Sequence, residues 1–493
     1  MLDRIGQRLP QPLTLFLITL TAVSVSLAFL KGLQDPDYFW HLQTGELIAR
    51  SGLPSHDPFS FTYGGPWTLH EWLGELLIFR MVDGMGPVAT LAVFGLLPPA
   101  TLAILAVALR RDGVPIRAVV AATLICGTVL IPYVTVRPQL ISWLLLAVVL
   151  AMLIRLRPRS ARMLVAFPLL FILWANLHGL YVIGLGVVAV YVLFTVVGAT
   201  DMSMRKGQVA LAGVASLLAS AVTPAGPAGL LYPLRYIDSG DWGLAHIPEW
   251  QSPNFHDLVQ IPLLALILGL AVVGQRGPTW VRAVAYLAVV GALLANRNAP
   301  VAAVACLPAL AIGLGRWLPE RQSSRAAGSR RLLETVAAAL LVVAALAAIP
   351  TTPGFAGVLL SRYPAAGVEH LRQLQPASRV VAEYGWGGYV IQSLYKDGAR
   401  VFVDGRNDMY PEAILRDYST IRAADPGWQA IVERYKADAM LFPPQAPIVK
   451  GIAQAAGWCE AYRDARQVLL LRSCAGAVRN SDRAIARTTG MSL

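Results

Sequence analysis

The sequence predicts a polytopic α-helical membrane protein with a smaller α/β domain at its C-terminal end. Of its 493 residues, 56% are hydrophobic and only 14% are charged, and long apolar stretches recur between short basic loops. Soluble proteins carry about 25% charged residues, and single hydrophobic cores stop growing near about 250–300 residues. The surplus apolar surface must therefore face lipid. This excludes a soluble enzyme, a disordered scaffold and a secreted disulfide framework.

Apolar stretches of about 15–20 residues are each long enough, or nearly so, to cross roughly 30 Å of hydrocarbon. The first lacks a small-residue cleavage site, so we expect an uncleaved signal anchor. About eleven transmembrane helices are predicted, at 13–30, 88–109, 118–134, 140–154, 163–175, 182–199, 209–222, 258–273, 281–295, 300–314 and 332–349.

Arginine and lysine set the orientation. They gather at the N-terminus and in alternate loops, at 110–117, 155–162, 205–206, 276–282 and 316–331. The positive-inside rule makes these loops and the N-terminus cytoplasmic. The multi-pass domain is then 1–349, with large outer loops at 31–87 and 223–257, and an extracytoplasmic domain follows at 350–493. The net charge of +12 comes largely from such loops rather than from a basic face, so no nucleic acid is expected as a partner.

The C-terminal domain alternates strand-like and helix-like segments, which predicts a partly parallel sheet. Cys459 and Cys474 lie in this domain and either pair or remain free thiols. In the first outer loop, 71–82 has apolar residues at helical spacing, as an interfacial amphipathic helix would. Strands are expected at 379–384, 399–403, 437–442 and 467–472, and helices at 411–423, 427–436 and 447–456.

Unusual polar residues gather in the predicted outer segments. Ionisable groups near a bilayer are costly and usually face a water-filled cavity, so the set predicts a polar cleft that opens outward. For each residue alone, the alternative is a helix cap or a headgroup anchor. The set comprises Asp35, Asp37, His41, His70, Glu71, Arg137, His178, Glu249 and Arg297.

The chemistry available to this set is acid–base and electrostatic. Asp35 and Asp37, held by Pro36, are candidates for a general base or for ligands of a divalent cation such as Mg or Mn. Arg137 and Arg297 match the oxygens of a lipid phosphate. The histidines of the set are suited to donate to that phosphate or to move a proton.

The order of these features resembles the GT-C superfamily of membrane glycosyltransferases, which includes the protein O-mannosyltransferase-like enzymes. Asp35-Pro36-Asp37 directly after the first helix, with His41 a turn later, carries the resemblance. In that superfamily an acidic residue at this place is the catalytic base or a metal ligand, which the resemblance carries onto Asp35 or Asp37. The segments 35–62 (DPDYFWHLQTGELIARSGLPSHDPFSFT), 386–390 (WGGYV) and 401–410 (VFVDGRNDMY) are also similar to those of uncharacterised bacterial membrane proteins.

The resemblance implies an inverting transferase in the bacterial cytoplasmic (inner) membrane. It implies a polyprenyl-phosphate-linked sugar donor and a glycan, lipid or protein acceptor. Asp35, Asp37 and His41 are the candidate catalytic residues. The candidate substrate-binding residues are His70, Glu71, Arg137, His178, Glu249, Arg297, Asp404 and Arg406.

Two alternatives stay open at this point. Asp404 and Arg406 leave a predicted strand where α/β sheets place ligand groups, or they form a structural turn with an internal ion pair. The whole protein is alternatively a non-catalytic carrier or export component for a lipid-linked or polymeric glycan. The helix centres are almost purely Leu, Val and Ala, whereas a transporter places ionisable groups near the midplane. This contrast favours the enzyme.

Overall fold

The computed structural model describes residues 19–21, 23–24, 35–155, 163–198, 206–232, 247–319 and 362–472, apart from 376, 408, 453, 454 and 456. The chain forms two compact units. The helical unit comprises Met1–Leu33 and His70–Thr351, and the sheet unit comprises Gln34–Leu69 and Thr352–Leu493. Much of the predicted first outer loop therefore folds with the C-terminal part of the chain.

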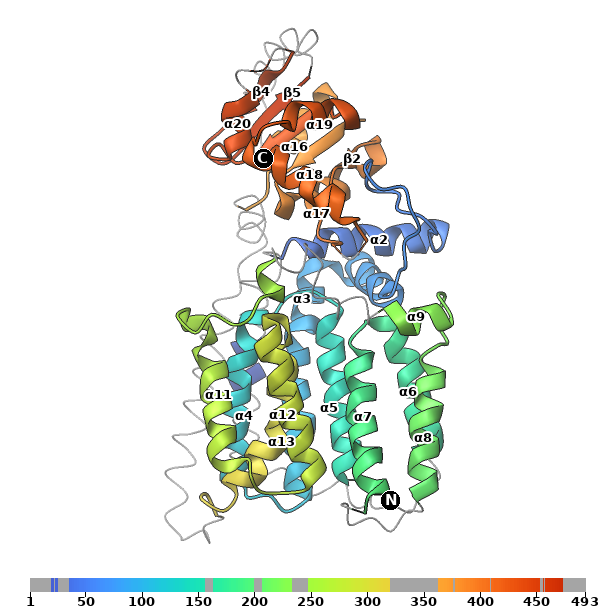
Figure 1. The fold of residues 1–493 in the computed structure, drawn as a ribbon, viewed down its shortest axis with the longest axis vertical. Helices are drawn as coiled ribbons and strands as arrows, with labels where there is room; N and C mark the ends of the chain where they lie inside the picture. The colour runs from blue at the N-terminus through green and yellow to red at the C-terminus, as the bar shows by residue number, and fades with distance from the viewer. Residues whose placement is uncertain are drawn as a thin grey trace. The chain divides into compact units, whose positions relative to one another are not determined.

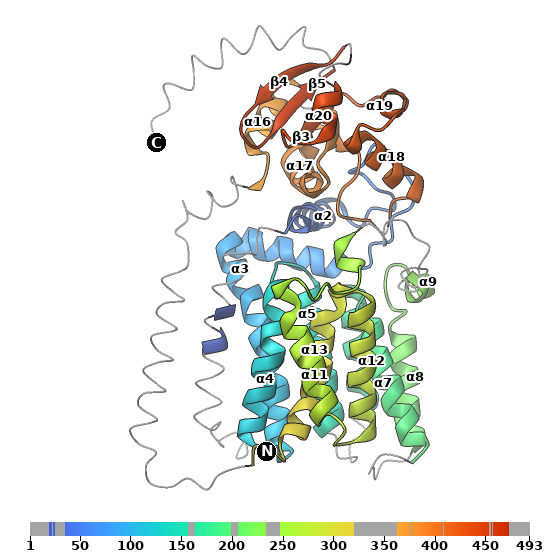
Figure 2. The same ribbon diagram turned by 60° about the vertical axis from the view of Figure 1, so that its left-hand side comes forward.

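The helical unit is a bundle of apolar helices (Figure 1). Helix α3 spans Trp72–Arg111 and is interrupted at Gly86, where φ is 81°. The half before Gly86 lies across one end of the bundle and the half after it runs along the bundle (Figure 2). The others are α4 (Ile116–Leu130), η2 (Ile131–Tyr133), α5 (Gln139–Arg155), α6 (Met163–Leu177), α7 (Tyr181–Val196), α8 (Lys206–Ala219), α9 (Pro227–Leu231), η4 (Pro248–Trp250), η5 (Leu258–Gln260), α11 (Ile261–Val273), α12 (Thr279–Leu294), η6 (Asn296–Asn298) and α13 (Ala299–Leu314).

Helix α13 is the centre of this bundle. It contacts α3, α4, α5, α11 and α12, and nearly all its residues are buried. Its small residues allow this close packing: a Cβ on Gly313 would lie 2.1 Å from the Val273 carbonyl oxygen. The peripheral helices expose large apolar side chains, such as Leu218 at 65% and Val272 at 73%. Such exposed apolar surface is suited to lipid.

The described residues confirm a multi-pass membrane protein. Nine predicted spans are apolar helices here, and Trp72–Arg111, Ile116–Tyr133 and Asn296–Leu314 are long and apolar enough to cross a membrane. The other six apolar helices are shorter, at 10–17 residues. The predicted helix at 332–349 lies outside the described residues, as does most of the one at 13–30. The helix expected at 71–82 is the first part of α3.

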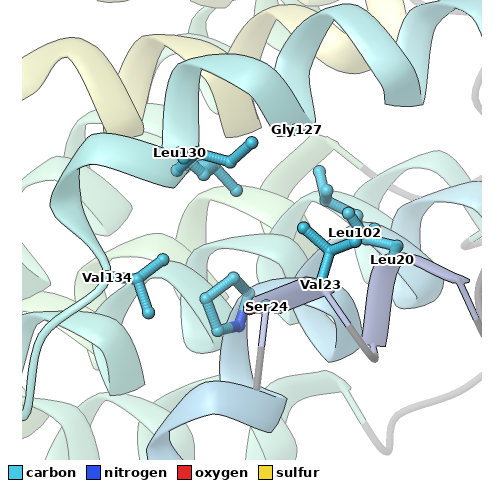
Figure 3. Close-up of a pocket in the computed structure, with 9 residues that line it drawn as sticks. Leu20, Val23, Ser24, Leu102, Gly127, Leu130 and Val134 are labelled. Atoms are coloured by element: carbon cyan, nitrogen blue, oxygen red, sulfur yellow. The ribbon is translucent and has the colours of Figure 1, made fainter. Parts of the chain in front are cut away.

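A small apolar hollow lies where the first segment meets α3 and α4 (Figure 3). Leu20 and Val23 lie beside Leu102 there, and a Cβ on Gly127 would be 3.4 Å from Leu102 Cδ1. No predicted site residue lines the hollow, so we assign it to helix packing. Its lining is Leu20, Val23, Ser24, Pro98, Leu102, Gly127, Leu130, Ile131 and Val134.

The sheet unit contains a five-stranded mixed sheet in the order β2-β1-β3-β5-β4. Strand β1 pairs in parallel with β2 and β3, and β5 pairs antiparallel with β3 and β4. The predicted partly parallel sheet is therefore confirmed. The elements are α2 (Asp37–Ser51), α16 (Ala365–Leu374), β1 (Arg379–Ala382), η7 (Tyr384–Trp386), α17 (Gly387–Leu394), η8 (Tyr395–Asp397), β2 (Arg400–Val401), α18 (Glu412–Ala423), α19 (Trp428–Tyr435), β3 (Ala439–Phe442), α20 (Pro447–Ile452), β4 (Cys459–Arg463) and β5 (Val468–Leu471).

The loop after α2 covers the β2 edge of this sheet. Val401 donates its backbone N–H to Phe59 and accepts the N–H of Phe61, at 3.0 and 3.1 Å. Ser60 forms a parallel bridge with Val401. An open strand edge invites pairing with another chain, and this loop closes it.

Candidate functional site

The two aspartates of the acidic motif have different surroundings. Asp35 is 7% exposed, and its Oδ1 accepts the backbone N–H of Asp37 at 3.0 Å. This bond satisfies one of the free donors at the start of α2. Asp37 is the first residue of α2 and is only half-buried, and the helix dipole favours its negative charge there. The geometry makes Asp35 a support for the helix and leaves Asp37 the more accessible carboxylate.

His41 lies one helical turn after Asp37. Residues four apart share a helix face, so α2 presents Asp37 and His41 on the same side. His41 is 3% exposed, and its ring packs against that of Trp40 with centroids 3.6 Å apart. The imidazole is therefore buried, one helical turn from the acidic motif.

The three segments that resemble those of bacterial membrane proteins meet in the sheet unit. A Cβ on Gly388 would lie 2.6 Å from the Pro36 carbonyl oxygen, and one on Gly387 would lie 2.6 Å from the Val403 carbonyl oxygen. The paired glycines thus bring the start of α17 against both the acidic motif and the end of β2. A Cβ on Gly405 would lie 1.9 Å from Asp37 Oδ1. The turn after β2 therefore lies against the acidic motif.

Asp404 and Arg406 are buried in an ion-pair cluster. Arg406 donates from Nε and Nη2 to the two oxygens of Asp404 at 2.7 and 2.6 Å, and from Nη1 to Asp57 Oδ1 at 2.7 Å. Tyr410 also donates to Asp404 Oδ2, at 2.6 Å. Asp404 is 0% and Arg406 2% exposed. The geometry favours a structural role for both side chains.

Burial and neighbouring charges act in opposite directions on the pKa values of this cluster. Burial alone would raise the pKa of the Asp404 carboxyl, but the charge and hydrogen bonds of Arg406 hold that pKa below its usual value. Burial likewise opposes the Arg406 charge, yet Asp404 and Asp57 raise the pKa of the guanidinium. The pKa of Tyr410 is raised by burial and then by the Asp404 charge. Asp404 and Arg406 are thus ionised at neutral pH, with Tyr410 a neutral donor.

In the helical unit, Glu71 lies between two predicted histidines. Its Oε1 is 2.9 Å from His70 Nε2, and its Oε2 is 4.0 Å from His178 Nε2. On its other side, His178 Nδ1 lies 3.0 Å from Ser142 Oγ and accepts the backbone N–H of Leu180 at 3.2 Å. An Nδ1 that accepts leaves the proton on Nε2. The His178 N–H is therefore directed toward the Glu71 carboxylate.

Ser142 and Trp174 complete this cluster, although neither was predicted from the sequence. Trp174 donates from Nε1 to Ser142 Oγ at 2.8 Å, and both side chains are 1% exposed. The available signal was Ser142 itself, a lone hydroxyl in the apolar helix α5. A third missed residue, Asp57, carries no local signal because its partner Arg406 is 349 positions away.

Gly74 on α3 allows these helix ends to approach one another closely. A Cβ on Gly74 would lie 2.6 Å from the Leu177 carbonyl oxygen and 2.9 Å from Pro138 Cβ. Trp72, on the same turn of α3, donates from Nε1 to Asn176 Oδ1 at 2.7 Å. Three motifs far apart in sequence therefore meet at one end of the bundle.

Two arginines at this end share one carboxylate. Arg137 Nη1 and Arg297 Nη1 each lie 3.5 Å from a different oxygen of Glu249. The Arg297 guanidinium also lies over the Trp250 ring, 4.0 Å from its centroid, a favourable cation–π arrangement. Arg137, Arg297 and Glu249 are 17%, 26% and 38% exposed. The group is therefore partly open to solvent.

The divalent cation expected at Asp35 and Asp37 stays a prediction. Across the described part of the chain, no group of three or more His, Cys, Asp or Glu side chains is arranged to hold a metal ion. Asp35, one of the two expected ligands, already accepts a backbone N–H.

Comparison with known proteins gives no match to a family model and none to a curated protein. Solved structures do match. The chain resembles the oligosaccharyltransferase AglB from Archaeoglobus fulgidus, in complex with an inhibitory peptide and a dolichol-phosphate, with a TM-score of 0.56 and 12% identity over 87% of this chain and 69% of that one. ArnT from Cupriavidus metallidurans, bound to undecaprenyl phosphate, matches with a TM-score of 0.52 and 15% identity over 92% of this chain and 98% of that one.

A third match is the arabinofuranosyltransferase AftD from Mycobacteria, with a TM-score of 0.55 and 16% identity. That match covers 95% of this chain and 40% of AftD. All three are GT-C glycosyltransferases. The expected GT-C architecture is therefore confirmed at the level of the fold.

Proposed function

We propose that this protein is an inverting membrane glycosyltransferase that takes its sugar from a polyprenyl-phosphate carrier. Its GT-C fold makes glycosyl transfer plausible. One observation within the chain carries the proposal furthest: a half-buried carboxylate, Asp37, stands at a helix N-terminus where three sequence motifs meet. A positioned carboxylate of this kind is suited to take a proton from an acceptor hydroxyl.

Asp37 is the base in this proposal, and Asp35 supports it. The acceptor oxygen attacks the anomeric carbon of the donor sugar as its proton passes to the Asp37 carboxylate. The bond from that carbon to the phosphate oxygen breaks, and polyprenyl phosphate leaves with the electron pair. Asp35 Oδ1 keeps its bond to the Asp37 backbone N–H and fixes the start of α2. His41, one turn after Asp37, is buried against the Trp40 ring and in this proposal helps to fix the helix face that carries Asp37.

The donor phosphate is assigned to Arg137 and Arg297. Two guanidinium groups that converge on one carboxylate also match the charge and geometry of a phosphate. Their contacts to Glu249 are long, at 3.5 Å each, and a longer contact is a weaker one. In this proposal Glu249 occupies the anion position in the absence of donor and gives way to the phosphate. His70, Glu71 and His178 lie beside Arg137 in this proposal. The close approach of Gly74 to Leu177 and Pro138 brings these segments together.

We further propose that the N-terminus is cytoplasmic and that the sheet unit is extracytoplasmic, in a bacterial inner membrane. The basic loops support this orientation. Cys459 supports it too, because it is disulfide-bonded and disulfides persist in oxidising compartments. Cys474, the partner considered from the sequence, lies outside the described residues.

Release of polyprenyl phosphate tests the proposal. Membranes that contain the wild-type protein are supplied with labelled polyprenyl-phosphate sugars, and release is compared with vector-only membranes. The double variant Arg137→Gln/Arg297→Gln should raise the donor KM, while Arg276→Gln, an exposed arginine in a basic loop, should not. Absence of release above the vector control from every donor would contradict the transferase and favour the non-catalytic carrier.

A further inference from the structure

The turn after β2 packs directly on the Asp37 carboxylate. A Cβ on Gly405 would lie 1.9 Å from Asp37 Oδ1 and 2.9 Å from its Cγ. Nonbonded carbon atoms normally approach to about 3.5–4.0 Å. The space that a side chain at position 405 would occupy is therefore filled by the carboxylate itself.

Trp40 and the Pro36 backbone also pack closely around this contact. On the remaining side of that space lies Trp40, whose Nε1 would be 3.1 Å from the same Cβ. Trp40 is 7% exposed. The backbone before Asp37 is also fixed, because a Cβ on Gly388 would lie 2.6 Å from the Pro36 carbonyl oxygen. A side chain added at Gly405 would thus displace the carboxylate, the indole or the turn.

The turn is anchored from within. Asp404 Oδ1 accepts both the backbone N–H and the Nε–H of Arg406, at 3.0 and 2.7 Å. Arg406 in turn donates to Asp57 at 2.7 Å. Gly405 lies between the two residues of this buried ion pair, so its position is set by charges that the interior keeps paired.

We propose that Gly405 is a positioning residue for the proposed transferase. The ion pair of Asp404 and Arg406 holds the turn, and the bare Cα of Gly405 supports the Asp37 carboxylate in its reactive orientation. The inference rests on the proposed function of Asp37. It assigns to the C-terminal part of the chain a direct influence on the rate of transfer, beyond covering or binding an acceptor.

Gly405→Ala tests this role. A misplacement of about 1 Å costs roughly 10²-fold in rate, so kcat for polyprenyl-phosphate release should fall about 10²-fold while the donor KM stays unchanged. Gly385→Ala is the matched control, since its Cβ would meet only Pro36 Cβ, at 4.0 Å, and it should keep wild-type kcat. Gly388→Ala places a methyl group against the Pro36 carbonyl oxygen, directly before Asp37, and should also lower kcat alone.

A double-mutant cycle separates positioning from general damage. If Gly405 acts through Asp37, Gly405→Ala should cost no further activity in an Asp37→Asn background. Limited proteolysis of the sheet unit should be unchanged in Gly405→Ala. Three results would each overturn the inference while the proposed function stands. They are wild-type kcat in Gly405→Ala, a loss that adds to that of Asp37→Asn, and a protease-sensitive sheet unit in Gly405→Ala and Gly388→Ala. Absence of release by the wild-type protein would overturn both.

Discussion

Arg406 donates a hydrogen bond from Nη1 to Asp57 Oδ1 at 2.7 Å, although 349 positions separate the two residues in the sequence. Both side chains are at most 1% exposed. The guanidinium also lies over the rings of Phe59 and Trp67, 5.0 and 4.7 Å from their centroids. This contact joins the loop after α2 to the turn after β2, so the acidic motif and the C-terminal strands share one core.

Removal of the Arg406 charge should destabilise the sheet unit severely. Arg406→Met leaves Asp404 and Asp57 buried without their cation, and an uncompensated buried charge costs about 3–5 kcal/mol. We expect a lower midpoint in thermal unfolding of the detergent-solubilised protein, together with rapid proteolysis of the sheet unit. Arg434→Met is the control: Arg434 is 62% exposed, pairs with Asp417 at 3.3 Å, and should change the midpoint little.

A second variant separates the loss of the Arg406 charge from the loss of its side-chain volume as causes of the lower stability. If the loss comes from unpaired carboxylates, Asp57→Asn and Asp404→Asn added to Arg406→Met should recover part of the stability, because neutral buried groups replace an ion pair at small cost. A triple variant less stable than Arg406→Met alone would contradict this account.

Acid should weaken the same cluster. The folded protein lowers the pKa of Asp404 below its ordinary value of 3.8. Its ionised form therefore contributes stability that is complete above that value and is lost as the pH falls through the lower, folded pKa. We expect the stability difference between wild type and Asp404→Asn to be constant at neutral pH and to shrink below about pH 4. Proteolysis by an acid-active protease across this range measures it, and a difference that does not change with pH would contradict the prediction.

Glu249 should compete with the donor phosphate. Glu249→Gln keeps the side-chain size and removes the charge between Arg137 and Arg297. A partly exposed ion pair contributes roughly 0.5–1 kcal/mol, which corresponds to about a two- to fivefold change in affinity. Because the phosphate no longer has to displace this pair, the variant should bind a short-chain polyprenyl phosphate about two- to fivefold more tightly. Binding of this lipid in detergent gives the measurement. Glu412→Gln, in the exposed pair with Arg416, should leave the affinity unchanged, and weaker binding by Glu249→Gln would contradict the assigned role.

Much of the fold follows from local patterns. Apolar stretches predicted the second part of α3 and the helices α4 to α8 and α11 to α13, because a segment that crosses lipid must be apolar along its whole length. The alternation in the C-terminal part predicted β1, β2, β3 and β5 because each strand is buried and short. The prediction that polar helix ends lie on one side follows from chain direction alone. Consecutive antiparallel helices alternate in direction, so every second connection lies on the same side.

The remainder depends on contacts that no local pattern reveals. Helix α2 buries Tyr38, Phe39, Trp40 and His41 in succession, so it lacks the one-sided periodicity by which helices are recognised. Asp404 and Arg406 have the composition of a ligand-binding turn, and only the structure shows that Arg406 is paired inside the protein with Asp404 and with the distant Asp57. The different surroundings of Asp35 and Asp37 likewise depend on which carboxylate accepts the backbone N–H, a matter of three-dimensional geometry.

The central claim is that Asp37 is the base of a polyprenyl-phosphate-dependent transferase, with Asp35 in support. The most direct measurement is the rate of polyprenyl phosphate release by Asp37→Asn and Asp35→Asn at equal expression. Loss of a general base costs about 10²–10⁴-fold, so Asp37→Asn should fall by that factor with the donor KM retained. Asp35→Asn keeps an oxygen that accepts the Asp37 N–H and should lose much less. Full release by Asp37→Asn, or a larger loss in Asp35→Asn, would contradict the claim.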